Sequence, residues 1–172
     1  MGCIKMKQKT LWIICGIPSS GKTIFIQKYF KNHSNCKIIS RDKIRFSFLK
    51  KGDKYFDRED LVFAKFGEKI KRALITYDDV IADATHLNEQ LRTELLDFLG
   101  ENFLKDIVIN CIYMDTSLNT ALRRNLTRTG WDYTYEQAIK DMWLITTCPN
   151  YNEKYKYDKI YIVNENGGIS LV

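Results

Sequence analysis

The stretch from Gly16 to Thr23 constrains the fold of this chain more than any other part of its sequence. It reads Gly-Ile-Pro-Ser-Ser-Gly-Lys-Thr and matches the pattern Gly-x-x-x-x-Gly-Lys-[Ser/Thr] without a mismatch. An apolar run of strand length precedes it over 11–15, and apolar residues at helical spacing follow it over 24–30. A strand, a glycine-rich turn and a helix N-terminus in this order direct backbone N–H groups and the helix dipole at a phosphate. The stretch therefore predicts a chain that binds a nucleoside triphosphate.

Within this phosphate-binding loop, the candidate ligands of the nucleotide are Gly16, Ser19, Ser20, Gly21, Lys22 and Thr23. Lys22 offers a point charge to the β- and γ-phosphates, and the hydroxyl of Thr23 is suited to ligate Mg²⁺. The alternative is a chance match to a loose pattern, against which the flanking strand and helix argue. We therefore expect ATP and Mg²⁺ as cofactors, with Thr23 as the metal ligand.

Strand-like and helix-like segments alternate along the chain. Apolar runs of strand length occupy 11–15, 36–40, 80–83, 107–114 and 159–163, and helical patterns occupy 24–30, 44–49, 58–77, 89–99, 117–129 and 135–146. Such alternation predicts a parallel sheet with right-handed crossovers and helices on both faces. We expect an α/β fold with a five-stranded parallel sheet, in a single domain over 1–172 that includes a helical lid at about 117–147.

Composition excludes several classes of protein. The formal net charge of +6 favours a polyanionic partner, although a nucleotide substrate or a solvated basic surface also accounts for it. The five cysteines are scattered and form no C-x-x-C pair, which indicates reduced thiols rather than disulfides or a zinc site. No apolar stretch is long enough to span a membrane, so we expect a cytoplasmic protein, in the host cytoplasm if it is viral. The sequence permits an oligomer but specifies none.

Polar residues follow every predicted strand. Ligands of parallel α/β sheets bind at the carboxyl ends of the strands, where all these residues meet. After the phosphate-binding loop of the first strand, these residues are Arg41, Asp42, Asp83, Asp115 and the turn at 164–168. A catalytic site is therefore expected at this edge of the sheet.

Asp42 is the best candidate for a general base. Phosphoryl transfer needs a group that orients an acceptor hydroxyl and takes its proton as the new bond forms. Arg45 lies three residues further on, hence on the same helix face, where a guanidinium could clamp a substrate phosphate. The alternative is that Asp42 only caps its helix while Arg41 and Arg45 are solvated.

Asp83, Arg124 and Arg128 complete the set of candidate catalytic residues. Asp83 ends an apolar strand, where its carboxylate can face Mg²⁺ through water or bind a substrate hydroxyl, or simply form a turn. Arg124 and Arg128 are four residues apart and are expected to share a helical face that neutralises the transferring phosphoryl group. An exposed basic helix face is an equally good interpretation of that pair, and Arg123 points elsewhere on the helix.

Four motifs occur in the order 16–23, 40–45 (Ser-Arg-Asp-Lys-Ile-Arg), 81–88 (Ile-Ala-Asp-Ala-Thr-His-Leu-Asn) and 124–128 (Arg-Asn-Leu-Thr-Arg). Together they resemble the polynucleotide 5′-hydroxyl kinase family, in particular the phage-type kinase module of end-healing kinase/phosphatase enzymes. The similarity spans nearly the whole chain, and the second and third motifs are its most restrictive part. It implies the P-loop kinase fold and a nucleic-acid repair activity.

The resemblance also implies residue roles. Asp42 would be the general base for the 5′-hydroxyl, and Arg45 would grip the adjacent 3′ phosphate of the substrate. Asp83 would be an essential carboxylate on the substrate side, and Arg128 with Arg124 would form the lid.

Some family features differ or are weakly marked here. The resemblance makes the turn at 164–168 a weak nucleobase-binding candidate. Arg123 stands where related lids often carry an acidic residue, and Thr129 intervenes between the last lid arginine and Gly130. No Asp-x-Asp-Gly-Thr sequence occurs, so we expect a kinase without the phosphatase half.

The resulting hypothesis is a phosphotransferase that moves the γ-phosphate of ATP to the 5′-hydroxyl of DNA or RNA ends. A small-molecule P-loop kinase acting on a nucleoside, nucleotide or modified base is the first alternative, because only its acceptor pocket would differ. An NTP-binding ATPase module of a larger assembly is the second. Such a module would not need Asp42 and Arg45 together.

Overall fold

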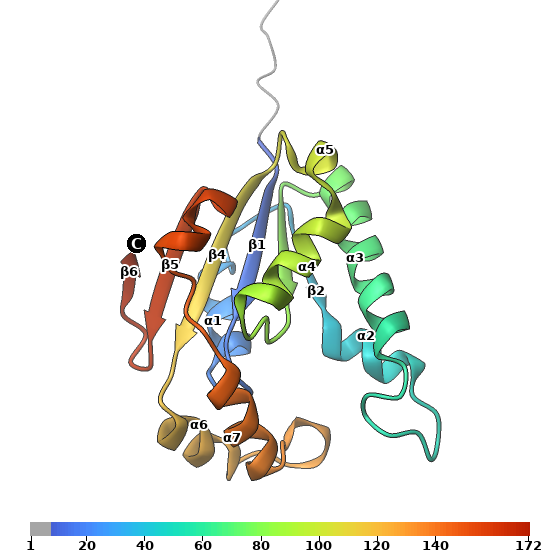
Figure 1. The fold of residues 1–172 in the computed structure, drawn as a ribbon, viewed down its shortest axis with the longest axis vertical. Helices are drawn as coiled ribbons and strands as arrows, with labels where there is room; N and C mark the ends of the chain where they lie inside the picture. Colours follow the sequence, from blue (N-terminus) through green and yellow to red (C-terminus); the bar gives the residue numbers. More distant parts are fainter. Residues whose placement is uncertain (1–7) are drawn as a thin grey trace, which may run out of the picture.

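A six-stranded sheet forms the centre of the molecule (Figure 1). The computed structural model describes residues 8–172, apart from the side chains of Trp131, Tyr151, Asn152 and Lys154. Neighbouring strands are parallel from β2 to β5 in the order β2-β3-β1-β4-β5-β6, and β6 is antiparallel to β5. The strands are β1 (Thr10–Cys15), β2 (Cys36–Ser40), β3 (Asp79–Asp83), β4 (Val108–Asp115), β5 (Lys159–Asn164) and β6 (Ile169–Leu171).

The central strand β1 is buried on both faces. Leu11 and Ile13 join the apolar core on one face, and Trp12 and Ile14 join the core on the other. Because successive side chains of a strand point to opposite faces, a strand covered on both sides is apolar throughout. This burial explains the uninterrupted apolar run before the phosphate-binding loop.

Helices cover both faces of the sheet (Figure 1). On one face, α3 (Glu59–Thr76) and α4 (Glu89–Leu99) pack against the core, with Phe66 fully buried. On the other face, α1 (Lys22–Tyr29) packs through Ile26. The remaining helices are α2 (Arg41–Phe48), α5 (Glu101–Leu104), α6 (Leu118–Asn125), α7 (Glu136–Ile145) and the 3-10 turns η1 (Gly130–Asp132) and η2 (Tyr151–Lys156).

The helices α6 and α7 lie together beyond the carboxyl ends of the strands (Figure 1). They pack on the phosphate-binding loop through a small apolar core of their own. Its buried members are Ile17, Leu87, Ala121 and Ile139. This core ties the region where the lid is expected to the loop that it would cover.

The α/β class, the parallel sheet and the helices on both faces are confirmed, but the sheet has six strands rather than five. The additional strand β6 follows the turn at 164–168 and contains three exposed residues. It therefore lacks the buried apolar pattern that marks a strand in the sequence. As an antiparallel neighbour of β5, it needs only a tight turn and no crossover helix.

The helix α2 begins earlier than predicted, at Arg41 rather than at 44. Ser40 is its N-cap, and the Ser40 side chain accepts a hydrogen bond from the backbone N–H of Lys43. Asp42 consequently lies in the first turn of the helix, and Ser40 rather than Asp42 caps it.

The helix α6 ends earlier than predicted, at Asn125 rather than at 129. The Thr127 hydroxyl donates a hydrogen bond of 2.9 Å to the carbonyl of Arg124, so a side chain takes the place of a backbone donor at this end. Arg128 therefore lies beyond the helix. The prediction that Arg124 and Arg128 share one helical face is wrong.

The described cysteines are free, as expected. Cys15, Cys36, Cys111 and Cys148 form no disulfide, and the sulfurs of Cys15 and Cys111 lie 3.4 Å apart inside the core. Cys3 lies outside the described residues. Within residues 8–172, no helix combines the length and the apolar character needed to cross a membrane.

Candidate active site

The phosphate-binding loop joins β1 to α1 through a backbone path that glycine makes possible. Gly16 and Gly21 have φ angles of 146° and 100°, and a Cβ on Gly16 would lie 2.8 Å from Ser20 Oγ and 2.9 Å from Met114 Cβ. No side chain fits at Gly16, and Gly21 is the left-handed N-cap of α1. Ser19 also has a positive φ of 64°, a strained value that is concentrated at functional turns.

Residues from distant parts of the chain hold this loop in place. The carbonyl of Ser20 accepts hydrogen bonds from Thr116 Oγ1 at 3.1 Å and from Arg124 Nη1 at 3.0 Å. Arg124 Nη2 also donates to the carbonyl of Glu165 at 2.8 Å. Arg124 thus joins the loop to the turn after β5. The sequence placed Arg124 at the site but gave no signal for Thr116.

The two serines of the loop have different surroundings. Ser19 Oγ lies 3.4 Å from Asn125 Oδ1 at the end of α6, and the Asn125 amide also donates to the carbonyl of Thr134. The buried hydroxyl of Ser20 finds no hydrogen-bond partner among the described residues. An unpartnered polar atom inside a phosphate-binding loop is a free donor for a phosphate oxygen.

Lys22 folds over the loop from the first turn of α1. Its Nζ donates to the carbonyls of Gly16 at 2.7 Å and Ile17 at 2.9 Å. Burial lowers the pKa of Lys22 to about 8, and the carboxylates of Asp83 and Asp42 oppose this shift. The ammonium therefore lies over the loop backbone, within electrostatic reach of both carboxylates.

Asp83 lies at the end of β3, paired in register with Ser40 of β2. Burial raises the pKa of the Asp83 carboxyl, and the Lys22 ammonium opposes that shift. Asp42 adds a second negative charge nearby. The structure therefore brings together Lys22, Asp83 and Asp42, as the sequence predicted.

The donor atoms at this edge fit a magnesium ion. Thr23 lies exposed in the first turn of α1, and its hydroxyl and the Asp83 carboxylate are oxygen ligands of the kind that Mg²⁺ prefers. Among residues 8–172, no group of three or more His, Cys, Asp or Glu side chains could hold a metal by itself. The chemistry suits an ion that takes the rest of its ligands from nucleotide phosphates and water.

Asp42 and Arg45 differ sharply in exposure. The Asp42 side chain is 64% exposed, whereas that of Arg45 is 6% exposed. Arg45 donates to Asp42 Oδ1 through Nη1 and to both carboxylate oxygens of Glu59, each at 3.0 Å, through Nε and Nη2. The rings of Tyr55 and Phe56 lie 4.5 and 5.4 Å from the guanidinium carbon. Arg45 is thus bound and covered by its own chain.

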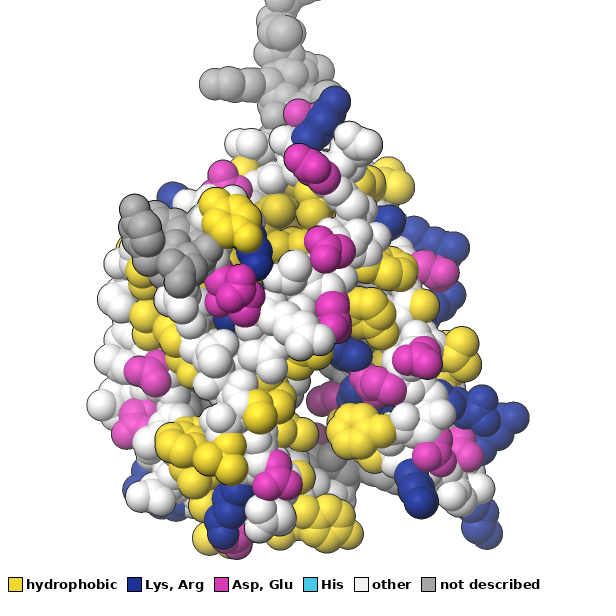
Figure 2. All heavy atoms as spheres, in the orientation of Figure 1, with side chains coloured by type: hydrophobic (Ala, Val, Ile, Leu, Met, Phe, Trp, Pro, Cys, Tyr) yellow, Lys and Arg dark blue, Asp and Glu magenta, His cyan; other side chains and the backbone are white. Residues whose placement is uncertain are grey.

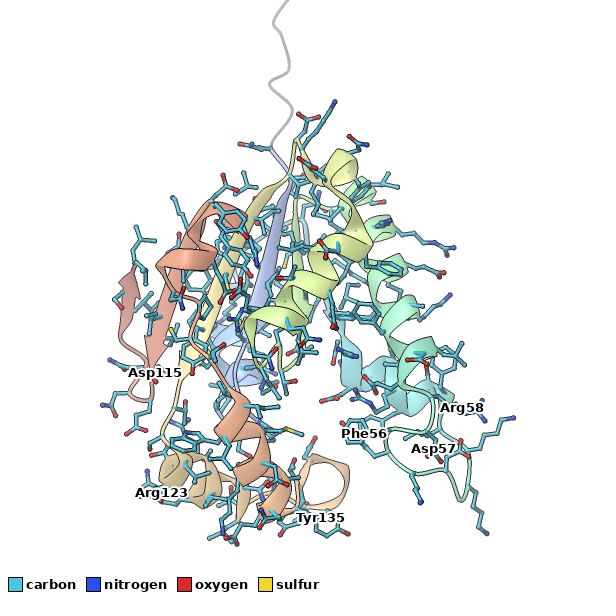
Figure 3. All side chains as sticks on the ribbon, viewed as in Figure 1. Phe56, Asp57, Arg58, Asp115, Arg123 and Tyr135 are labelled. Carbon is cyan, nitrogen blue, oxygen red and sulfur yellow. The ribbon has the colours of Figure 1, made fainter. Side chains whose placement is uncertain are left out.

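Arg128 lies near the loop although it is not on α6. Its Nη1 donates to the carbonyl of Asp132 at 3.3 Å, and its positive charge contributes to the lowered pKa of Lys22. Arg123 points away from the site on the outer side of α6 (Figure 3). The structure therefore places both Arg124 and Arg128 near the phosphate-binding loop, although they do not share a helical face.

A cleft separates the region of α6 and α7 from the region of α2 and the start of α3 (Figure 2). Apolar side chains gather on its α7 side, and charged and apolar side chains lie together on the opposite side. A second hollow of about 560 Å³ lies beside the ends of β4 and β5, with Tyr113, Asp115, Trp143, Asn164 and Glu165 in its lining. Its volume falls within the range of small-molecule sites. No pattern in the sequence singled out Trp143.

Comparisons with known proteins agree with this geometry. A model of an AAA domain family matches residues 11–143, and no curated protein sequence matches the chain. A chain of the Pnkp1/Rnl/Hen1 RNA repair complex is 18% identical, with a TM-score of 0.67. That match covers 90% of this chain and only 48% of the other.

Two further structures are similar over most of both chains. An unliganded sugar kinase from Janibacter sp. HTCC2649 is 11% identical with a TM-score of 0.65, covering 93% of this chain and 87% of the other. Kti12 from Chaetomium thermophilum, in complex with ADP-AlF3, is 15% identical with a TM-score of 0.62, covering 90% and 88%. At these identities the likeness establishes a shared P-loop kinase-like fold.

Proposed function

The chain belongs to this AAA domain family, and on that basis we propose that it transfers the γ-phosphate of ATP to the 5′-hydroxyl of DNA or RNA ends. The observation that carries the proposal is the position of Asp42. Asp42 follows β2, the strand next to β3. Its carboxylate is exposed and lies within electrostatic reach of Lys22 in the phosphate-binding loop. A base beside the γ-phosphate site is what transfer to a hydroxyl requires.

In the proposed reaction, the acceptor oxygen forms a bond to the γ-phosphorus as the bond from that phosphorus to the β–γ bridging oxygen breaks. The acceptor proton passes to Asp42, and ADP leaves with the bridging oxygen. Lys22 and the guanidinium groups of Arg124 and Arg128 offset the charge on the phosphoryl oxygens. The Thr23 hydroxyl and the Asp83 carboxylate are the residues that would hold Mg²⁺, which when bound would supply positive charge against the phosphate oxygens.

The donor nucleotide is proposed to enter from the side of the turn at 164–168. Loop backbone N–H groups and the free Ser20 hydroxyl would bind its phosphates. The hollow next to β4 and β5, which Trp143 and Glu165 line, is large enough for a nucleobase. Kti12, similar in fold, was solved with ADP-AlF3, which supports a nucleotide ligand for this fold.

Arg45 favours a second candidate, a kinase of small molecules. A guanidinium that is 6% exposed and bound by Glu59 and Asp42 is not open to a substrate phosphate. An acceptor without such a phosphate would not need it. A sugar kinase is among the structures of similar fold, which makes this candidate the direct competitor.

Transfer from γ-labelled ATP tests the two candidates. The protein with Mg²⁺ is offered 5′-hydroxyl DNA and RNA oligonucleotides, a nucleoside 3′-monophosphate, free nucleosides and free sugars in parallel. We expect label on the oligonucleotides and none on the same oligonucleotides that already carry a 5′-phosphate. Label on small molecules alone would support the second candidate, and label on no acceptor would contradict both.

A further inference from the structure

The segment between α2 and α3 brings a tyrosine to the candidate base. Tyr55 OH donates a hydrogen bond of 2.8 Å to Asp42 Oδ1, from a position thirteen residues further along the chain. The segment is held by two side-chain turns, in which Asp53 accepts from the backbone N–H of Lys50 at 2.9 Å and Asp57 accepts from that of Lys54 at 2.7 Å. A loop with defined hydrogen bonds therefore places the Tyr55 hydroxyl beside Asp42.

The ring of Tyr55 is fixed by its neighbours. It lies over the Arg45 guanidinium at 4.5 Å and makes edge contacts with the rings of Phe46 at 6.0 Å and Phe56 at 4.7 Å. Burial raises the pKa of the Tyr55 phenol to about 12, and the Asp42 charge adds to the shift. The phenol therefore keeps its proton at neutral pH and donates it toward the carboxylate.

Both donors meet the same oxygen of Asp42. Arg45 Nη1 and Tyr55 OH bind Oδ1, whereas Oδ2 accepts no hydrogen bond from any residue that the structure describes. The Asp42 side chain is 64% exposed, so Oδ2 is open to an incoming group. In Figure 3, Phe56 lies on the side of the segment that faces the cleft, whereas Arg58 lies on its outer side. Tyr55, the neighbour of Phe56 in the chain, reaches the exposed Asp42 carboxylate from this segment.

We propose that Tyr55 is a positioning residue: it holds Asp42 Oδ1 so that Oδ2 meets the acceptor hydroxyl. This inference rests on the proposed function, in which Asp42 is the base. A carboxylate with one oxygen fixed by two donors has lost most of its rotational freedom before the acceptor arrives. Arg45 contributes to the same oxygen, and Glu59 compensates its charge.

The test is Tyr55→Phe, which removes the hydroxyl and keeps the ring. We expect kcat for the accepted substrate to fall about tenfold, since a hydrogen bond to a charged group is lost. The KM values for ATP and acceptor should stay within twofold. Tyr77→Phe is the matched control, because Tyr77 lies between α3 and the start of β3, at the amino ends of the strands. The kcat of this variant should equal that of the wild type.

A double-mutant cycle separates positioning from a general structural effect. In an Asp42→Asn background, Tyr55→Phe should lower the residual kcat less than twofold, since the tyrosine acts through that carboxylate. A tenfold loss in both backgrounds would overturn the inference. So would a kcat of Tyr55→Phe within twofold of the wild type.

Crystal structures of the wild type and Tyr55→Phe give a readout that does not depend on activity. We expect one Asp42 rotamer in the wild type and more than one in the variant. A single unchanged rotamer in both proteins would overturn the inference. Failure of the wild type to phosphorylate any acceptor would instead overturn the proposed function, and the rotamers would still decide whether Tyr55 positions Asp42.

Discussion

The two halves of the candidate site are built differently. On the donor side, backbone groups of the phosphate-binding loop form the binding surface, and Thr116 and Arg124 hold the carbonyl of Ser20. On the acceptor side, side chains form the surface, with Asp42 exposed and held by Tyr55 and Arg45. A backbone cradle accepts any phosphate chain, whereas side chains select one acceptor. The fold therefore determines how the donor phosphates would bind, whereas the side chains of this sequence would determine which acceptor is used.

The largest effect is expected on the acceptor side. Asp42→Asn keeps the shape of the side chain and removes the base, so transfer should fall about 10²- to 10⁴-fold, the usual contribution of a general base. The Kd for ATP should stay within twofold, because the cradle is untouched. Calorimetry and single-turnover transfer measure the two quantities.

Asp97→Asn is the matched control, since Asp97 is exposed on α4 away from the site. It should leave both quantities unchanged. Wild-type transfer by the Asp42→Asn protein would contradict the assignment of Asp42 as the base on the acceptor side.

The next effect is expected in the loop backbone. Gly16→Ala forces a Cβ to within 2.9 Å of Met114 Cβ at a φ of 146°, a strain of about 1–3 kcal/mol, so ATP affinity should fall about tenfold or more. Gly100→Ala is the control, because Gly100 has a φ of 84° with open space around it. Equal ATP affinity of both variants would show that nucleotide binding does not depend on the backbone conformation at Gly16.

A smaller effect is expected at Arg124. Arg124→Met removes the hydrogen bonds to the carbonyls of Ser20 and Glu165, so the KM for ATP should rise about tenfold while the KM for the acceptor stays constant. Arg123→Met, the adjacent arginine on the outer side of α6, should change neither value (Figure 3). A rise in the acceptor KM of Arg124→Met would place this arginine on the other side of the site.

The smallest effect is expected on the preference between two acceptors, which a substitution of Arg45 should leave unchanged. Because Arg45 is covered and bound to Asp42 and Glu59, Arg45→Lys should lower kcat/KM by the same factor for a nucleoside and for its 3′-monophosphate. Arg58→Lys, on the outer side of the same segment, is the control (Figure 3). A selective loss for the 3′-monophosphate would mean that Arg45 turns to grip a substrate phosphate, as the family resemblance implies.

The same contrast decides how much could be predicted from the sequence. The loop, the parallel sheet and the strand-end position of Asp83 follow from local patterns, because burial on both faces and a glycine turn leave clear signatures. Contacts such as Tyr55 with Asp42, or Thr116 with Ser20, join segments far apart in the chain. They depend on loop paths that no periodicity encodes. The position of the phosphate-binding loop could therefore be predicted from the sequence, whereas the contacts that hold Asp42 could not.

Two local errors have equally local causes. β6 is short and exposed, so it carries no apolar pattern. The end of α6 is set by the Thr127 hydroxyl, which binds the carbonyl of Arg124 in a way that helical spacing cannot predict. Arg128 still lies close enough to contribute to the lowered pKa of Lys22, although it is beyond the end of the helix.

The proposed function requires that the side chains around Asp42 select a 5′-hydroxyl end. The measurement that tests it most directly is the ratio of kcat/KM for a 5′-hydroxyl oligonucleotide to kcat/KM for a free sugar, taken at saturating ATP and Mg²⁺. We expect a ratio above about 100, which corresponds to more than about 2.7 kcal/mol of difference in transition-state binding. A ratio below one would contradict it and would assign the chain to the small-molecule kinases.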